Sequence, residues 1–375
     1  MSELPLPPAR STSARDNSSE EAKQVSTIEK SAVELLAQRI AGDMAGGLGM
    51  ILVHIGEQTG LFVALAQGSA SSQELADRAG LAERYVREWA SAMAAAGYIL
   101  YDPADARFSL SPEQETVFAS EGNSYYAPPF SDMLVSIAKD ESLVVDAFRT
   151  GEGIPWGDHN ACLFCSTERL TSQTVLPQLI QKWLPQVHID LNCEGSVPRI
   201  VDIGCGRGKA AIAMAEAFPH ASVYGLDLHQ PSVERARDAA ASAGLSNAHF
   251  IAAPAEDTQE KDFDLAVIID ALHDMGDPVA VAAKVRSILK PEGRFLVIEP
   301  YAADRLEDNF TLGGRMGYAA STCICTPASL SRPGRAALGA QAGYARLSDV
   351  LKRAGFNKIR AIQNEPTNIV IEAVA

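Results

Sequence analysis

One stretch near the middle of the chain constrains the fold more than any other: VDIGCGRGKAAIAMAEAFP, from Val201 to Pro219. A short apolar run leads into a glycine-rich turn, and an alanine-rich helical pattern follows the turn. A strand, a tight turn and a helix in this order indicate the start of a parallel sheet covered by helices. Because glycine lets the backbone approach a ligand closely, the turn is expected to hold one.

The rest of the chain after about Pro198 repeats this alternation of strands and helices. Strand patterns occur in RIVDI, SVYGLDL, AHFIAA, FDLAVIID, GRFLVIEP and in the final stretch KIRAIQNEPTNIVIEAV. The pattern predicts an α/β domain over residues 196–375, with helices on both faces of a parallel sheet. Ligands of such sheets bind beyond the carboxyl ends of the strands.

The chemistry of the turn excludes one common ligand and favours another. Its glycines are spaced by single residues, whereas a dinucleotide-binding turn needs G-x-G-x-x-G, so a nicotinamide-dependent oxidoreductase is disfavoured. Asp202 precedes the first glycine, and its carboxylate would repel a pyrophosphate. S-adenosylmethionine carries a sulfonium and an ammonium and no phosphate, and it suits such a turn.

Two later strand ends add acidic groups at suitable positions. Asp227 ends the second strand, where a carboxylate can accept hydrogen bonds from ribose hydroxyls. Glu256 or Asp257, after the third strand, is placed to reach an adenine amino group. The predicted cofactor contacts are Asp202, Gly204, Cys205, Gly206, Gly208, Asp227, Leu228, Glu256, Asp257 and Asp270.

The segments VDIGCGRG, GLDLH, APAED, FDLAVIIDALHDM and LKPEGRFLVIEP stand in the order seen in class I S-adenosylmethionine-dependent methyltransferases, and the chain resembles that family over about residues 198–300. The N-terminal part is similar to a subgroup, related to small-molecule O-methyltransferases, in which a winged-helix domain precedes the methyltransferase domain. The resemblance implies a Rossmann-like sheet of seven strands with the last strand antiparallel. It also implies S-adenosylhomocysteine as the product and a homodimer formed through the N-terminal domain.

Methyl transfer from a sulfonium is a direct displacement, so the acceptor must lie in line with the methyl group. A hydroxyl acceptor must also lose a proton. IIDALHDMGDP follows the fourth strand and offers Asp270, His273 and Asp274. By the resemblance, His273 is the candidate general base, and Asp270 or Asp274 orients it; the alternative is a structural histidine beside a helix-capping Asp274.

The first 195 residues divide into three predicted parts. Residues 1–25 are polar and rich in serine and proline, as in a disordered tail. Residues 26–119 show a helix–turn–helix–hairpin order, typical of a mainly helical winged-helix domain. Residues 120–195 form a helical connector that acts as a substrate lid. Aromatic and apolar side chains of the lid and of the segment after the fifth strand predict an apolar acceptor pocket, with walls formed by Tyr126, Trp156, Phe164, Tyr301, Met316 and Tyr318.

A winged helix also raises the alternative of a transcriptional regulator with a non-catalytic S-adenosylmethionine-sensing domain. Arg84 and Arg87 lie in its second helix, but Glu83 and Glu88 cancel their charge. The chain has 47 acidic and 32 basic residues, a formal net charge of −15, which disfavours nucleic acid as a partner. The expected partner is therefore a small-molecule acceptor.

Cysteine usage and hydropathy complete the expectations. No apolar run approaches the roughly 18 residues of a membrane span, and the N-terminus has no apolar signal core. Cys162 and Cys165, and Cys323 and Cys325, form close pairs that could bind zinc, but buried packing thiols are favoured and no metal is predicted. Reduced thiols without an export signal predict a cytoplasmic protein.

Overall fold

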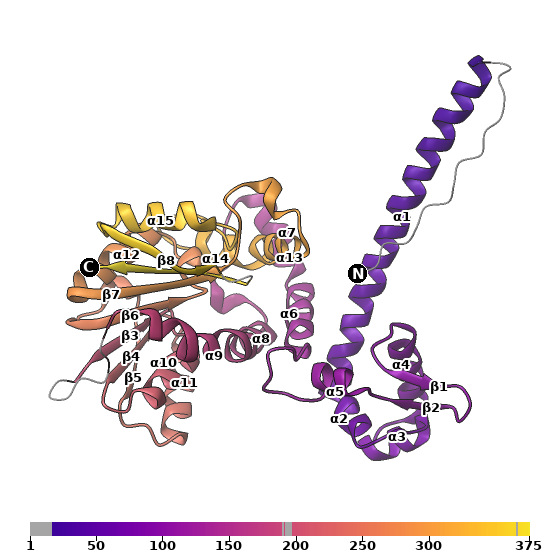
Figure 1. The fold of residues 1–375 in the computed structure, drawn as a ribbon, viewed down its shortest axis with the longest axis horizontal. Helices are drawn as coiled ribbons and strands as arrows, with labels where there is room; N and C mark the ends of the chain where they lie inside the picture. The colour runs from indigo at the N-terminus through magenta and orange to yellow at the C-terminus, as the bar shows by residue number, and fades with distance from the viewer. Residues whose placement is uncertain (1–16, 190, 192–196, 365–366) are drawn as a thin grey trace.

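The computed structural model describes residues 17–189, 191, 197–364 and 367–375 (Figure 1). A helical N-terminal domain and a domain built on one large sheet are joined by a helical connector (Figure 1). None of the helices in the described ranges is long and apolar enough to cross a membrane.

The predicted seven-stranded sheet is confirmed. Its strand order is β5-β4-β3-β6-β7-β9-β8, and only β9 runs antiparallel to its neighbours, β7 and β8. The last strand of the chain is therefore the antiparallel one, as the resemblance implied. The strands are β3 (Arg199–Ile203), β4 (Ser222–Asp227), β5 (Ala248–Ala252), β6 (Phe263–Ile269), β7 (Leu289–Pro300), β8 (Lys358–Asn364) and β9 (Asn368–Val374).

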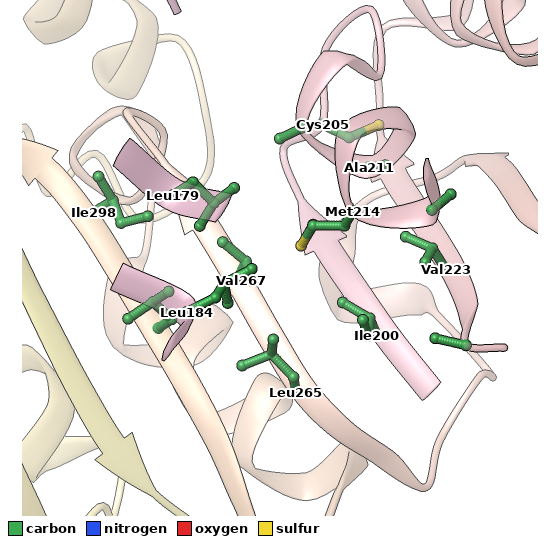
Figure 2. Close-up of a cluster of buried hydrophobic side chains, with 14 of the residues drawn as sticks. Leu179, Leu184, Ile200, Cys205, Ala211, Met214, Val223, Leu265, Val267 and Ile298 are labelled. Atoms are coloured by element: carbon green, nitrogen blue, oxygen red, sulfur yellow. The ribbon is translucent and has the colours of Figure 1, made fainter. Parts of the chain in front are cut away.

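Successive side chains of the central strands enter two different cores, because strand side chains alternate between the faces of a sheet. On β6, Leu265 and Val267 pack in one core, while Ala266 and Ile268 pack in the other. Figure 2 shows the first core, where Met214 of the helix after β3 lies over the sheet near these strands. Both faces are covered, which explains the nearly continuous apolar runs of the strand sequences.

Different helices cover the two faces. The first core contains residues of α10 (Lys209–Ala217), α11 (Gln230–Ser242) and the end of the connector. The second core contains residues of α12 (Pro278–Ile288) and α15 (Gly343–Arg353). An insertion between β7 and α15 carries α13 (Leu312–Ala320), a π-helical turn (Ser321–Cys325) and α14 (Thr326–Leu330).

The N-terminal domain has the predicted winged-helix order. A capping box of Ser71 and Glu74 starts its third helix, and the hairpin pairs Leu100 with Ser109. The elements are α1 (Asn17–Gln58), α2 (Leu61–Ala66), α3 (Ser72–Ala79), α4 (Glu83–Ala95), β1 (Leu100–Asp102), β2 (Arg107–Ser109) and α5 (Pro112–Phe118).

Helix α1 differs from the expected disordered tail. It begins at Asn17, so residues 17–25 are helical, and residues 1–16 lie outside the described part. The helix has 42 residues, and its N-terminal part extends away from the rest of the molecule (Figure 1). Near its C-terminal end Val53 packs in the core of the N-terminal domain.

The connector is helical throughout most of its described length. The guanidinium of Arg169 pairs with Glu57 of α1, which ties the connector to the N-terminal domain. It also pairs at 2.8 Å with Asp132, within the connector. Its helices are α6 (Pro128–Lys139), α7 (Glu141–Thr150), α8 (Ala161–Leu170) and α9 (Leu176–Gln178), with π-helical turns at Thr171–Val175 and Leu179–Trp183.

Candidate active site

A cavity of about 500 Å³ lies beyond the carboxyl ends of β3, β4 and β6, at the edge of the sheet where a ligand was expected. The carboxyl ends of parallel strands meet at one edge, so residues far apart in sequence converge there. Nine of the ten predicted cofactor contacts line the cavity: Asp202, Gly204, Cys205, Gly206, Asp227, Leu228, Glu256, Asp257 and Asp270.

Gly208, the tenth predicted contact, is not among the lining residues. It precedes α10 with a φ of 77°, a conformation that favours glycine. A Cβ atom at this position would lie 2.6 Å from the Phe250 ring and 2.7 Å from Ala236. Gly208 therefore allows helix and sheet to approach closely, which gives it a role in packing.

The glycine turn is held by a carboxylate of the neighbouring strand. The backbone N–H of Gly206 donates to Oδ2 of Asp227 at 2.8 Å, and the N–H of His229 donates to Oδ1 at 2.8 Å. Each carboxylate oxygen can accept a further hydrogen bond. Asp227 can thus fix the turn and still accept from a bound hydroxyl.

Asp202 is a buried carboxyl in the cavity wall. It is 2% exposed, and its Oδ2 atom has no hydrogen-bond partner within the described residues. Burial and the nearby carboxylate of Asp227 raise the pKa of Asp202 to about 7. A cationic ligand in the cavity would favour the ionised form of this carboxyl group.

Asp270 follows β6 with a φ of 48°, a backbone conformation that is strained for a non-glycine residue. Its Oδ1 atom is buried without a partner. Burial and the carboxylate of Glu299 raise the pKa of Asp270 to about 7. Asp202 and Asp270 thus both belong to the wall of the same cavity.

A general base was expected in the wall of this cavity, but His273 lies outside it. It is 3% exposed and is not a lining residue of the cavity, whereas Asp274 is. The imidazole Nδ1 atom pairs with Oε2 of Glu299, and the N–H of Leu272 donates to the other oxygen of Glu299 at 2.9 Å. Glu299, on β7, was not singled out from the sequence.

The neighbours of His273 also shift its pKa. Burial lowers the pKa of the imidazole, but the carboxylates of Glu299 and Asp274 outweigh it and raise the pKa well above its ordinary value. Only the neutral ring has a lone pair that can accept a proton or bind a cation.

The predicted acceptor walls divide into two groups. Trp156 and Phe164 line the cavity, and their rings meet edge to face at 5.6 Å. Tyr126, Tyr301, Met316 and Tyr318 are not among the residues that line this cavity.

These four residues have other surroundings. The hydroxyl of Tyr126 donates to Glu57 at 3.0 Å, between the connector and α1. Tyr318 lines a separate cavity of about 360 Å³ in the insertion after β7. Tyr301 and Met316 are exposed.

Several cavity residues were missed because their signal is not local. Glu168, on α8, pairs at 2.8 Å with Arg207 of the glycine turn and at 3.2 Å with Lys209, the first residue of α10. Phe164, on the same helix, stacks on His229 with ring centroids 5.1 Å apart and an angle of 7° between the planes. These contacts between connector and sheet domain depend on how the two pack. His229 alone had a sequence signal, since it directly follows the GLDL strand.

The arginines of the winged helix are neutralised in the structure. Arg84 pairs with Glu88 at 2.6 Å, and Arg87 pairs with Glu83 at 2.8 Å, all on α4. A helix that contacts phosphates needs basic groups free to do so. These pairs do not favour the regulator alternative.

The comparisons with known proteins agree with this architecture. Residues 196–355 match the family model of a methyltransferase domain, and residues 47–119 match an Rv2258c-like winged HTH domain. The predicted resemblance is thereby confirmed for both parts. The 27-O-demethylrifamycin SV methyltransferase of Amycolatopsis mediterranei is 33% identical over 142 residues, which cover 37% of this chain and 47% of that protein. The chain spans 35% to 61% of the length of the curated relatives it matches.

Solved structures are similar over nearly the whole chain. The mitomycin 7-O-methyltransferase MmcR has a TM-score of 0.65 at 20% identity, with 92% of this chain and 100% of that chain covered. Human N-acetylserotonin methyltransferase, solved in complex with SAM, has a TM-score of 0.66 at 16% identity, with 90% and 97% covered. At these identities the likeness establishes the fold.

Proposed function

We propose that this chain, in which a methyltransferase domain follows a winged helix-turn-helix domain, transfers a methyl group from S-adenosylmethionine to a hydroxyl group of a small molecule. The observation that carries the proposal is the cavity at the carboxyl edge of the sheet, where the glycine turn and the acidic strand ends meet. Relatives that are named as methyltransferases of small molecules support it.

The cavity fits the proposed cofactor in charge. Asp202 and Asp270 place two carboxyl groups in the cavity wall, which suits a ligand that brings positive charge. The carboxylates would disfavour a pyrophosphate, and the two basic groups at the glycine turn, Arg207 and Lys209, are already paired with Glu168. When bound, S-adenosylmethionine supplies a sulfonium-activated methyl group.

The residues of this chain position the cofactor and the acceptor, and they form an apolar wall. The turn and Asp227 fix the nucleoside side of the cavity, while Trp156 and Phe164 exclude water from it. We place the acceptor hydroxyl beside Asp274, in line with the methyl group, because Asp274 is the predicted catalytic side chain nearest to His273 that lines the cavity. His273 lies behind it as a positioning residue, with its Nε2 atom 3.2 Å from Oδ1 of Asp274.

Calorimetry with S-adenosylmethionine and with S-adenosylhomocysteine tests the cofactor, and a labelled-methyl screen over phenols, acids, amines and thiols tests the acceptor. We expect both nucleosides to bind and a phenol or other hydroxyl compound to be labelled. His273→Ala is expected to retain cofactor binding and to lose most turnover. Binding of a nicotinamide dinucleotide in place of both nucleosides would overturn the proposal.

We also propose a homodimer formed through α1. Seven apolar side chains on this helix recur three or four residues apart and are exposed by 41% to 67%: Val33, Leu36, Ile40, Met44, Leu48, Ile51 and Ile55. A continuous exposed apolar stripe of this kind is typical of a helix that packs on another helix. Gly47, beside the stripe, has open space around its Cβ position, which permits close approach.

A further inference from the structure

Three side chains of different chemical type converge beside the cavity. His273 and Asp274 belong to the short helical turn Leu272–Asp274 that follows β6, and Cys325 ends the π-helical turn Ser321–Cys325 of the insertion. One nitrogen, one oxygen and one sulfur atom from these side chains all lie within 4.8 Å of one another. Imidazole, carboxylate and thiolate are the three ligand types that zinc takes from proteins.

The pair of His273 and Asp274 is arranged like two ligands rather than like a hydrogen-bonded pair. The Nε2 atom lies 3.2 Å from Oδ1, yet Oδ1 has no hydrogen-bond partner within the described residues. A tetrahedral ion that binds both atoms at about 2.0–2.1 Å holds them about 3.3 Å apart.

The other nitrogen of His273 has the partner that metal-bound histidines use. Nδ1 pairs with Glu299, which is 1% exposed and is itself fixed by the N–H of Leu272 at 2.9 Å. A carboxylate at Nδ1 fixes the tautomer in which Nε2 carries the lone pair and orients the ring toward an ion. The second partner of the imidazole is thus already in place.

We propose that Nε2 of His273, Oδ1 of Asp274 and Sγ of Cys325 form a binding site for one divalent ion of the zinc type. Three protein ligands leave a fourth position open, as in catalytic zinc sites. Asp274 lines the cavity, so the ion lies at the cavity wall, where an oxygen of the acceptor can take the open position. This last step rests on the proposed function, whereas ion binding does not.

Such an ion changes how the acceptor loses its proton. A hydroxyl bound to zinc has a lowered pKa and is deprotonated near neutral pH without a neutral histidine base. Nε2 of His273 cannot bind an ion and accept a proton at once. The ion, and not His273, therefore activates the acceptor. The released proton passes to solvent through the cavity.

The neighbouring Cys323 provides a matched control. It lies on the same π-helical turn as Cys325, but it is not part of the three-residue group. Both thiols are free; Cys325 is buried and Cys323 is partly buried. Cys323→Ala therefore tests for unspecific effects of removing a thiol from this turn.

The experiment measures Zn²⁺ and Co²⁺ binding to the purified full chain by equilibrium dialysis with elemental analysis, and the absorption spectrum of the Co²⁺ form. We expect one ion per chain and a sulfur-to-cobalt charge-transfer band in the wild type and in Cys323→Ala. Cys325→Ala is expected to lose the band and most of the affinity, and Glu299→Gln to bind about 10- to 100-fold more weakly. Circular dichroism confirms that each variant is folded.

Two results would overturn the site. One is a folded wild-type chain that takes up no Zn²⁺ or Co²⁺ at micromolar concentrations. The other is equal binding and an equal spectrum in Cys325→Ala and Cys323→Ala. Cofactor binding by calorimetry is measured in parallel, so failure of the ion site is distinguished from failure of the proposed methyltransferase function.

Discussion

The backbone N–H of Gly206 donates a 2.8 Å hydrogen bond to the carboxylate of Asp227, which joins the turn after β3 to the end of β4. The two residues are 21 positions apart, and the parallel pairing of β3 with β4 brings them together. The shape of the glycine turn is therefore fixed by the neighbouring strand as well as by its own glycines.

Replacing this carboxylate tests its part in holding the turn. In Asp227→Asn the amide oxygen can keep one of the two backbone hydrogen bonds, while the NH₂ group cannot accept the other. We expect a loss of about 1–3 kcal/mol in unfolding free energy and roughly tenfold weaker S-adenosylmethionine binding, by chemical denaturation and calorimetry. Asp238→Asn, at an exposed position on α11, is the control. Equal stability and affinity in both variants would contradict the assignment.

The packing role of Gly208 predicts a large stability effect. Gly208→Ala places a Cβ 2.6 Å from the Phe250 ring, in addition to the strain of a φ of 77°. Gly244→Ala has a similar φ of 69° but open space around the Cβ position. We expect Gly208→Ala to lower the unfolding free energy by about 1–3 kcal/mol more than Gly244→Ala. Similar melting temperatures for the two variants would show that Phe250 and Ala236 simply move aside.

The buried carboxyl of Asp202 makes stability depend on pH. Its pKa rises from 3.8 unfolded to about 7 in the folded chain, so the folded state binds the proton more tightly. This contribution to stability is complete below about pH 4 and is lost as the pH rises through 7. In the ligand-free protein we expect the unfolding free energy of Asp202→Asn to lie close to that of the wild type at pH 5. At pH 8 we expect it to exceed the wild-type value by about 1–3 kcal/mol.

Denaturant titrations at the two pH values measure this difference, with Asp238→Asn as the control for losing an exposed carboxylate. If the difference in unfolding free energy between the wild type and Asp202→Asn were the same at both pH values, the raised pKa would be contradicted. The same variant is expected to bind S-adenosylmethionine more weakly, since it lacks the carboxylate that faces the cation. A gain in stability with a loss of binding is typical of a strained functional residue.

The apolar stripe of α1 predicts the oligomeric state. Leu36 and Ile40 are each 59% exposed, so glutamates there change the surface of the helix and leave the core intact. We expect the double variant Leu36→Glu/Ile40→Glu to sediment as a monomer and the wild type as a dimer. Gln38→Glu, on another side of the same helix, is expected to remain dimeric. An unchanged mass of the double variant would exclude the stripe as the interface.

Much of the cavity lining could be predicted because its signals are local. Asp202, Gly204 and Asp227 stand at strand ends, and the carboxyl ends of parallel strands meet at one edge whatever the details of packing. Gly208 shows the limit of this reasoning. Its spacing in the turn suggested ligand contact, but the space around it is set by Phe250 on another strand.

The sequence by itself determined the order of strands and helices, the antiparallel last strand through the family resemblance, and the acidic edge of the glycine turn, because period, turn chemistry and charge are properties of neighbouring residues. Only the tertiary structure decided that His273 lies behind the cavity wall against Glu299 and that α8 closes the cavity through Phe164 and Glu168. It also decided that Tyr126 serves the contact with α1. These outcomes depend on which side chains meet when distant elements pack, and no local pattern encodes the direction in which a side chain then points.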